Sequence, residues 1–249
     1  SSDGNTAIVG AIHDDVGPNY RQGTATVFVR INGIWVQQQQ LTANAGAARD
    51  YFGRSVALSS DGNTAIVGSS DDDVNANADQ GTATVFVRAN GAWTQQQQLT
   101  VADGASGDEF GFKVALSGDG NTAIATSLWD DVGSNTDQGT ATVFVRANGV
   151  WTQQQQLIAP GGAAGDLFGY SVALASDGNT VIIGAFLDDV DSRSDQGTAT
   201  VFVRANGLWT QQQQLTALGG ASGDWFGASV ALNSNGNTAI VGAAQDDLG

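Results

Sequence analysis

Residues 52–68 read FGRSVALSSDGNTAIVG, in which a Phe-Gly pair and a short apolar run are joined by an Asp-Gly-Asn turn to a second apolar run. The phrase recurs at intervals of 58 residues, and its opening pairs are Phe52-Gly53, Phe110-Gly111, Phe168-Gly169 and Phe226-Gly227. Self-similarity at a fixed period is typical of repeat architectures, in which each unit buries its apolar face against its neighbours. We therefore expect the Phe of each pair to be a core anchor and the Gly to form a corner.

The period divides the chain into a single repeat domain, 1–249, with four full units and part of a fifth. The full units span 1–58, 59–116, 117–174 and 175–232, and the partial copy spans 233–249. Because the partial copy repeats the opening residues, the two ends of the chain claim the same position in an array. A closed four-bladed ring, strand exchange between chains and a segment of a longer array all fit this pattern.

Each unit contains four strand-like runs, which in the second unit are 55–58, 64–67, 81–88 and 93–99. Tight hairpin signals, Asp-Gly-Asn and Asn-Gly, separate the first two runs and the last two. Gly, Thr, Val and Asn are abundant, whereas the helix-favouring residues Glu, Lys and Met are almost absent. The sequence predicts an all-β fold, a β-propeller-type array of four-stranded antiparallel blades with a 58-residue repeat.

Charge and composition exclude several classes of protein. The chain has 25 acidic residues against 9 basic ones, a formal net charge of −16, which repels phosphate backbones and argues against a nucleic-acid partner. There is no apolar run long enough to span a membrane as a helix. The absence of Cys removes disulfides, thiol catalysis and Cys-type zinc sites.

The repeated phrase, followed in each unit by Val-Phe-Val-Arg and, in three of them, by Trp-Thr-Gln-Gln, resembles the FG-GAP repeat of bacterial secreted proteins, which is related to the integrin α-subunit propeller. The resemblance covers the whole chain and implies a β-propeller at an extracellular or cell-surface location. The chain departs from the family pattern in two ways. No copy keeps the Pro of the Gly-Ala-Pro element, and the calcium loop of many members, Asp-x-Asp-x-Asp-Gly, is not present as such.

A pair of Asp residues follows the second strand of every unit. These pairs are Asp14-Asp15, Asp72-Asp73, Asp130-Asp131, Asp188-Asp189 and Asp246-Asp247. Carboxylates in loops at the ends of strands can hold Ca²⁺, so calcium is a possible cofactor and these Asp residues are its candidate ligands. The favoured interpretation is that one Asp of each pair accepts backbone N–H bonds that shape the loop while the other is solvated.

Two further sets of loop residues, one acidic and one aromatic, have different expected roles. An Asp precedes each Phe-Gly pair, at 50, 108, 166 and 224, and we expect its side chain to bond the loop backbone. Four aromatic residues are candidates for contacts with a glycan or a protein ligand: Tyr20, Trp129, Phe186 and Trp225. Packing on the neighbouring blade is the favoured alternative for the aromatic residues.

The sequence offers little for catalysis. His13 is the only His, its position varies between units, and no Gly-x-Ser-x-Gly motif accompanies it. The four-residue Gln tracts, at 37–40, 95–98, 153–156 and 211–214, are typical of a solvated outer strand. The alternative is an adhesive edge whose Gln side chains form ladders with another chain. We therefore expect a non-catalytic extracellular structural or adhesive scaffold that self-assembles through its surplus terminal strand. The alternative is a lectin-like propeller that binds a glycan or protein with one loop site per blade, and the expected partner is accordingly a second copy of the chain or such an extracellular ligand.

Overall fold

The computed structural model describes residues 1–247, so residues 248 and 249 of the partial fifth copy lie outside the described residues. The first sheet contains β1 (Thr6–Ala11), β2 (Thr24–Ile31) and β3 (Ile34–Leu41). The second contains β4 (Val56–Leu58), β5 (Thr64–Ser69), β6 (Thr82–Ala89) and β7 (Ala92–Leu99). The third contains β8 (Phe110–Leu116), β9 (Thr122–Ser127), β10 (Thr140–Ala147) and β11 (Val150–Leu157). The fourth contains β12 (Ser171–Leu174), β13 (Thr180–Ala185), β14 (Thr198–Ala205) and β15 (Leu208–Leu215), and the last contains β16 (Phe226–Leu232) and β17 (Ala239–Ala243).

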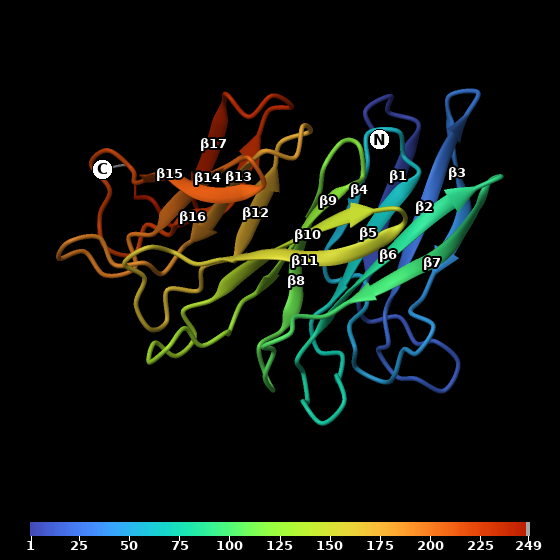
Figure 1. Ribbon diagram of the computed structural model, residues 1–249, viewed down its shortest axis with the longest axis horizontal. Helices are drawn as coiled ribbons and strands as arrows, with labels where there is room; N and C mark the ends of the chain where they lie inside the picture. The colour runs from blue at the N-terminus through green and yellow to red at the C-terminus, as the bar shows by residue number, and fades with distance from the viewer. Residues whose placement is uncertain (248–249) are drawn as a thin grey trace.

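The predicted all-β array of four-stranded antiparallel blades is confirmed. The three central sheets have the orders β4-β5-β6-β7, β8-β9-β10-β11 and β12-β13-β14-β15, and all their neighbouring strands are antiparallel. The inner strands β4, β8, β12 and β16 contact one another in succession, so that the blades lie side by side from the first sheet to the last (Figure 1). No helix, and hence no helical membrane span, occurs in residues 1–247.

The hairpin turns form through local side-chain bonds. Asp61 Oδ1 accepts hydrogen bonds from the Ser59 hydroxyl at 2.6 Å and from the Asn63 backbone N–H at 2.9 Å. The second hairpin places Asn90 and Gly91 at φ of 52° and 81°, the left-handed region that Asn and Gly enter at least cost. The short polar sequences between the runs therefore determine where each strand ends.

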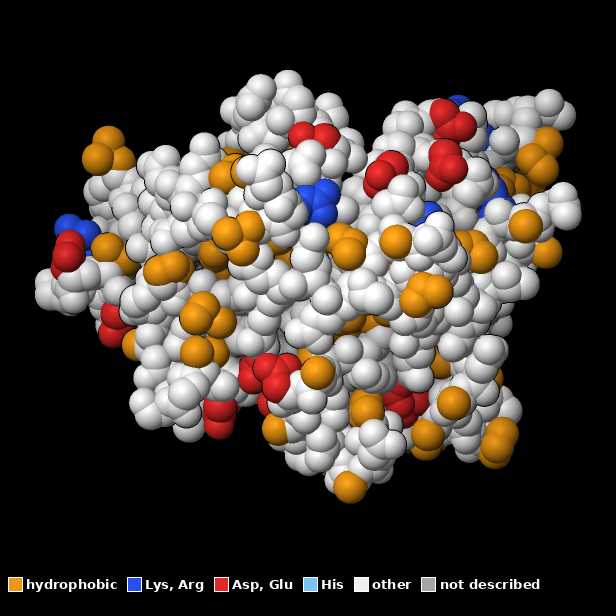
Figure 2. Space-filling model, in the orientation of Figure 1, with side chains coloured by type: hydrophobic (Ala, Val, Ile, Leu, Met, Phe, Trp, Pro, Cys, Tyr) orange, Lys and Arg blue, Asp and Glu red, His pale blue; other side chains and the backbone are white. Residues whose placement is uncertain are grey.

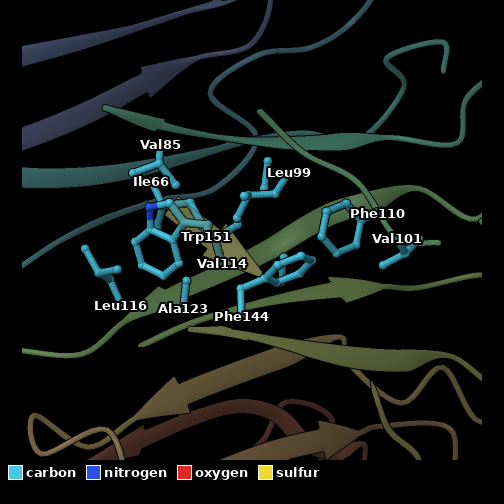
Figure 3. Close-up of a cluster of buried hydrophobic side chains, with 12 residues drawn as sticks. Ile66, Val85, Leu99, Val101, Phe110, Val114, Leu116, Ala123, Phe144 and Trp151 are labelled. Carbon is cyan, nitrogen blue, oxygen red and sulfur yellow. The ribbon is translucent and has the colours of Figure 1, made fainter. Parts of the chain in front are cut away.

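The hydrophobic core lies between blades. In the cluster that joins the second blade to the third, Ile66, Val85 and Leu99 lie opposite Phe144 and Trp151 (Figure 3). The Phe of the Phe-Gly corner, Phe110, belongs to the same cluster and is fully buried. Full burial of a side chain of this size contributes about 1.5–3 kcal/mol, so each junction between blades is a main source of stability.

The glycine of each corner permits a close approach of two blades. Gly111 has a φ of 91°, and a Cβ added to Gly68 would lie 1.9 Å from the Gly111 carbonyl oxygen. No side chain fits at Gly68 without moving the backbone of the next blade. The Phe-Gly corner and the glycine near the end of the second strand are thus two halves of one contact, which recurs at Gly10 with Gly53 and at Gly184 with Gly227. At the remaining corner, Gly169 lies against Thr126 instead.

The two terminal sheets are incomplete in opposite ways. The first sheet has the order β1-β2-β3 and lacks an inner strand equivalent to β4, whereas the last has only the two inner strands β16 and β17. Residues 238–243 repeat the sequence of β1, Thr-Ala-Ile-Val-Gly-Ala. The two partial sheets lie at opposite ends of the array in Figure 1, where they are blue and red.

Candidate functional site

The first Asp of each pair bonds its own blade. In the third blade, Asp130 Oδ2 accepts hydrogen bonds from the Thr140 hydroxyl at 2.6 Å and from Gln156 Nε2 at 3.1 Å. The equivalent Thr hydroxyl and Gln amide make the same two bonds in the other blades. They donate to Asp14, Asp72 and Asp188. This carboxylate therefore ties the loop after the second strand to the two outer strands.

The second Asp of each pair closes its own loop. Asp131 Oδ1 accepts a hydrogen bond at 2.9 Å from the backbone N–H of Asp137, six residues further on. The equivalent bonds are made by Asp15, Asp73 and Asp189. Residues 1–247 contain no group of three or more His, Cys, Asp or Glu side chains placed to hold a metal ion. Calcium binding by the pairs, including the exposed Asp246 and Asp247, stays a prediction.

The Asp before each Phe-Gly pair has the loop bond expected of it. Asp108 Oδ2 accepts a hydrogen bond at 2.6 Å from the backbone N–H of Ala105, and Asp50, Asp166 and Asp224 do the same in their units. All four carboxylates are buried, and Asp50, Asp108 and Asp166 lie within electrostatic reach of the Asp pair of the same blade. Each complete blade thus presents three carboxylates at the same loop edge.

One of these loop edges contains a pocket of about 500 Å³. It is open to solvent, and Figure 2 shows acidic side chains along the lower edge of the molecule, where these loops lie, as well as at the upper edge. The charged and aromatic residues that line it belong to the third blade and the loops around it. They are Asp103, Asp108, Glu109, Trp129, Asp130, Asp131 and Asp137.

Burial and crowding change the acidity of the pocket. Burial raises the pKa of Asp130 to about 6, and the nearby charges of Asp108, Asp103 and Asp131 act in the same direction. Burial likewise raises the pKa of Asp108 and of Glu109. Carboxyl groups with a pKa moved toward neutrality exchange protons readily at physiological pH, as general acids and bases must.

Two of the residues that line the pocket, Glu109 and Trp129, occupy positions that vary between all units. The position of Glu109 holds Tyr51, Leu167 and Trp225 in the other units, and Glu109 is the only Glu of the chain. The Trp129 side chain, 38% exposed, lies close enough to the Glu109 carboxylate to lower its pKa, against the larger effect of burial. The backbone of Glu109 has a φ of 54°, a left-handed conformation that costs a residue other than Gly about 1–3 kcal/mol.

The remaining aromatic candidates lie elsewhere. Phe186 stacks between Tyr170 and Trp225, with ring centroids 4.2 and 5.4 Å away, so three successive loop regions pack on one another. Tyr20 is half exposed and lies under the Arg21 guanidinium, 4.9 Å from its ring centroid. Of the four candidates only Trp129 lines the acidic pocket. Ligand contacts by the other three stay predictions.

The Gln tracts make contacts that the sequence interpretation missed. Gln97 exchanges two 2.9 Å hydrogen bonds with the backbone N–H and C=O of Trp151 in the next blade, and Gln96 Oε1 accepts a 3.0 Å bond from the Trp151 indole. The interpretation as a solvated strand was therefore incomplete. The available signal was the constant spacing of 54 residues between this Gln and the Trp of the following unit.

The fold and these loops define a propeller-type repeat protein, and sequence comparison gives the family. The FG-GAP repeat matches residues 35–86, 93–144, 151–202 and 209–249, and the chain belongs to the FG-GAP repeat family. No curated protein matches the chain in sequence. Among solved structures, the chain is similar to the periplasmic gluconolactonase of Pseudomonas aeruginosa, with 20% identity and a TM-score of 0.62. The similarity covers 97% of this chain and 62% of that protein, so the chain spans less than two thirds of its neighbour's length.

This comparison corrects the functional expectation. A non-catalytic scaffold, with a lectin-like module as the alternative, was expected because the loops repeat, but a protein of similar fold is an enzyme. The expectation that the chain is not an enzyme is wrong for the same reason. The inference failed because symmetry of the backbone does not require symmetry of the loops, and a site can be built where one unit differs from the rest.

Proposed function

We propose that the chain forms part of a hydrolase that opens small polyhydroxylated lactones in the acidic pocket of the third blade. The observation that carries the proposal is the coincidence in one pocket of Asp130, whose pKa is raised to about 6, with Glu109 and Trp129, residue types that no other unit has at these two variable positions. The fold likeness to a gluconolactonase supports the choice of a lactone as substrate.

The pocket contains groups for both proton transfers of lactone opening. Asp130, as a carboxylate, accepts the proton of a water molecule whose oxygen attacks the lactone carbonyl carbon. The bond from that carbon to the ring oxygen then breaks, and Glu109 in its neutral form donates a proton to the departing oxygen. The donors Thr140 and Gln156 orient the Asp130 carboxylate, and burial favours the neutral form of Glu109.

The charge of the pocket selects a neutral substrate. The pocket is lined by ten residues, of which five are Asp and one is Glu. These carboxylates repel an anionic substrate but not an uncharged lactone. The Trp129 ring offers an apolar face against which the C–H face of a sugar ring can pack. The product is a carboxylate, so like-charge repulsion favours its release after ring opening.

The place of action follows from the same neighbour. That protein is periplasmic, and it supports a location outside the cytoplasm for this chain as well. The high net negative charge and the absence of Cys are compatible with such a compartment.

The test measures hydrolysis of glucono-1,5-lactone by proton release, with the spontaneous rate subtracted. We expect the wild-type chain to accelerate ring opening and Asp130→Asn to lower the rate by about 10²–10⁴-fold, since the variant cannot accept the proton. Glu109→Gln removes the proton donor and has an effect of similar size.

The repeat supplies a matched control in Asp188→Asn. Asp188 makes the same two bonds, to Thr198 at 2.6 Å and to Gln214 at 3.1 Å, but it lies in the fourth blade and does not line the pocket. The two Asn variants should lose similar stability, and only Asp130→Asn should lose activity. A wild-type rate equal to the blank, or an equal loss in the Asp188 variant, would refute the proposal.

A further inference from the structure

The same side-chain clamp joins the blades at three junctions. At each, two adjacent Gln residues of one outer strand bond the Trp of the next blade: the first accepts the indole N–H at 3.0 Å, and the second exchanges two bonds of 2.9–3.0 Å with the Trp backbone. An Arg stacks on the Trp ring, 5.3–5.4 Å from its centroid. The Gln and Trp pairs are Gln38 and Gln39 with Trp93, Gln96 and Gln97 with Trp151, and Gln154 and Gln155 with Trp209.

The first blade presents the Trp half of a fourth clamp. Trp35 occupies the clamp position but is 46% exposed, whereas Trp93, Trp151 and Trp209 are only 3–4% exposed. Val9, on the same face, is 55% exposed, although its equivalent in the second blade, Val67, is fully buried. Arg30, at the position of the stacking Arg, is exposed as well.

The fourth blade presents the Gln half. Gln212 and Gln213 stand at the clamp positions of β15 and are exposed, whereas the equivalent Gln residues of the other blades are half-buried. Leu215 is only half-buried, although Leu41, Leu99 and Leu157 at its position are 2% exposed. The two outward faces of the chain are therefore the two complementary halves of an interface that the chain itself forms three times.

We propose that these faces bind each other between two copies of the chain, so that the Trp35 face of one copy docks head-to-tail on the Gln212–Gln213 face of another. The contact between copies would use the same Gln–Trp bonds and apolar packing that already join the blades within one chain. It is heterologous, because two Trp35 faces would bring together two donors without the Gln acceptors that each requires. The interface between copies has the same clamp and apolar residues as the internal junctions.

The terminal strands allow this junction to form. β16 pairs with β17, and residues 238–243 have the sequence of β1, so β1 of the second copy can take the place of β17 beside β16. The product is one complete four-stranded blade, built from β16 of one copy and β1, β2 and β3 of the other. Displacement of β17 loses little burial, since Ile240 within it is 72% exposed.

Electrostatics oppose the first encounter. Each copy carries a formal charge of −16, so copies repel at low ionic strength and approach more readily when salt screens the charge. We therefore expect association to strengthen between 0.05 and 0.5 M NaCl, although the clamp bonds themselves are between neutral amides and an indole.

The experiment is sedimentation equilibrium or mass photometry of the full chain at increasing concentration. Wild type should form dimers and longer oligomers, and the outcome that overturns the proposal is a monomer at every concentration and salt level. Trp35→Ala and the double variant Gln212→Ala/Gln213→Ala should each weaken self-association by at least about tenfold, as expected for central contacts of an interface. Association as strong as that of wild type in both would also overturn it.

Mixing the two variants gives the sharper test. Trp35→Ala keeps a working Gln face and the double variant keeps a working Trp face, so a head-to-tail contact predicts that the mixture forms a one-to-one heterodimer. Failure of the mixture to associate would overturn the proposal. The controls are Ile34→Ser and Thr210→Ala, because these side chains are exposed beside the two faces but take no part in the clamp, and both should associate as wild type does.

Discussion

At the scale of single residues, two neighbouring Thr positions of each third strand have opposite environments. In β10 the Thr140 hydroxyl donates to Asp130 at 2.6 Å, whereas the Thr142 hydroxyl is buried without a hydrogen-bond partner. Thr84 and Thr200 repeat the unpartnered hydroxyl in β6 and β14. A buried hydroxyl without a partner costs stability, and a paired one contributes to it.

This contrast predicts opposite effects of one substitution. Thr142→Val should raise the free energy of unfolding by about 1 kcal/mol, because it removes an unpaired polar atom, and Thr140→Val should lower it by about 1–3 kcal/mol. Urea denaturation followed by Trp fluorescence measures both. A loss of stability in Thr142→Val would show that its hydroxyl is hydrogen-bonded.

The pKa of Asp130 predicts how catalysis depends on pH. A general base is active when ionised, and burial raises the pKa of Asp130 to about 6, so lactone opening should fall about tenfold per pH unit below 6. The rate should also fall at higher pH, where Glu109 ionises and can no longer donate its proton. The measurement is the blank-corrected rate between pH 4.5 and 7.5. A rate that rises as the pH falls would assign Asp130 the role of an acid.

At the scale of elements, the outer strand of each blade is a connector. In β7 the Gln97 amide pairs with the backbone of Trp151 as a neighbouring strand would, and Arg146 Nη1 donates to Gln96 Oε1 at 3.3 Å. Adjacent blades are therefore joined at their outer edges by side-chain amides, in addition to the apolar core nearer the centre.

The connector predicts a difference between two equivalent Gln residues. Gln97→Ala should lower the free energy of unfolding by about 1–3 kcal/mol, because it leaves the Trp151 N–H and C=O without partners. Gln213→Ala, at the same position of β15, should change it by less than about 0.5 kcal/mol when the protein is dilute enough to be monomeric. Equal effects would mean that the Gln contributes through its own strand alone.

At the scale of the whole molecule, buried carboxyl groups set the pH of maximum stability. Burial raises the pKa of Asp50, Asp130 and Asp166 from 3.8 to about 6. The folded state therefore binds more protons than the unfolded state between pH 3.8 and 6, and stability increases as the pH falls through this window. Hydrogen bonds from Ser59 and Asn63 lower the pKa of Asp61 despite its partial burial, so the stability that Asp61 contributes is lost below pH 3.8.

This balance predicts a protein that is more stable at pH 5 than at pH 7.5. The urea midpoint should rise as the pH falls over that range, and the rise should be smaller in Asp50→Asn/Asp166→Asn, which lacks two of the three groups. A midpoint that falls toward pH 5 would contradict the raised pKa values.

The sequence was sufficient for the fold because its signals are local and repeated. The Asp-Gly-Asn and Asn-Gly turns form through contacts within a few residues. The constant 58-residue period of the apolar runs and the Phe-Gly corners shows that every unit packs on its neighbours in the same way. The composition of the loops was also readable, since the Asp before each corner bonds the backbone three residues earlier.

Contacts between units depended on the tertiary structure. Gln97 and Trp151 meet only when blades stack. Asp130 and Glu109 meet when β8 and β9 pair within the third blade, and burial rather than residue type raises the pKa of Asp130. The sequence predicted a chain without an active site because its units are nearly identical, so that no single unit stood out as a site. The proposed site depends on side chains at variable positions, such as Glu109, whose acidity is set by the neighbours that folding brings to them.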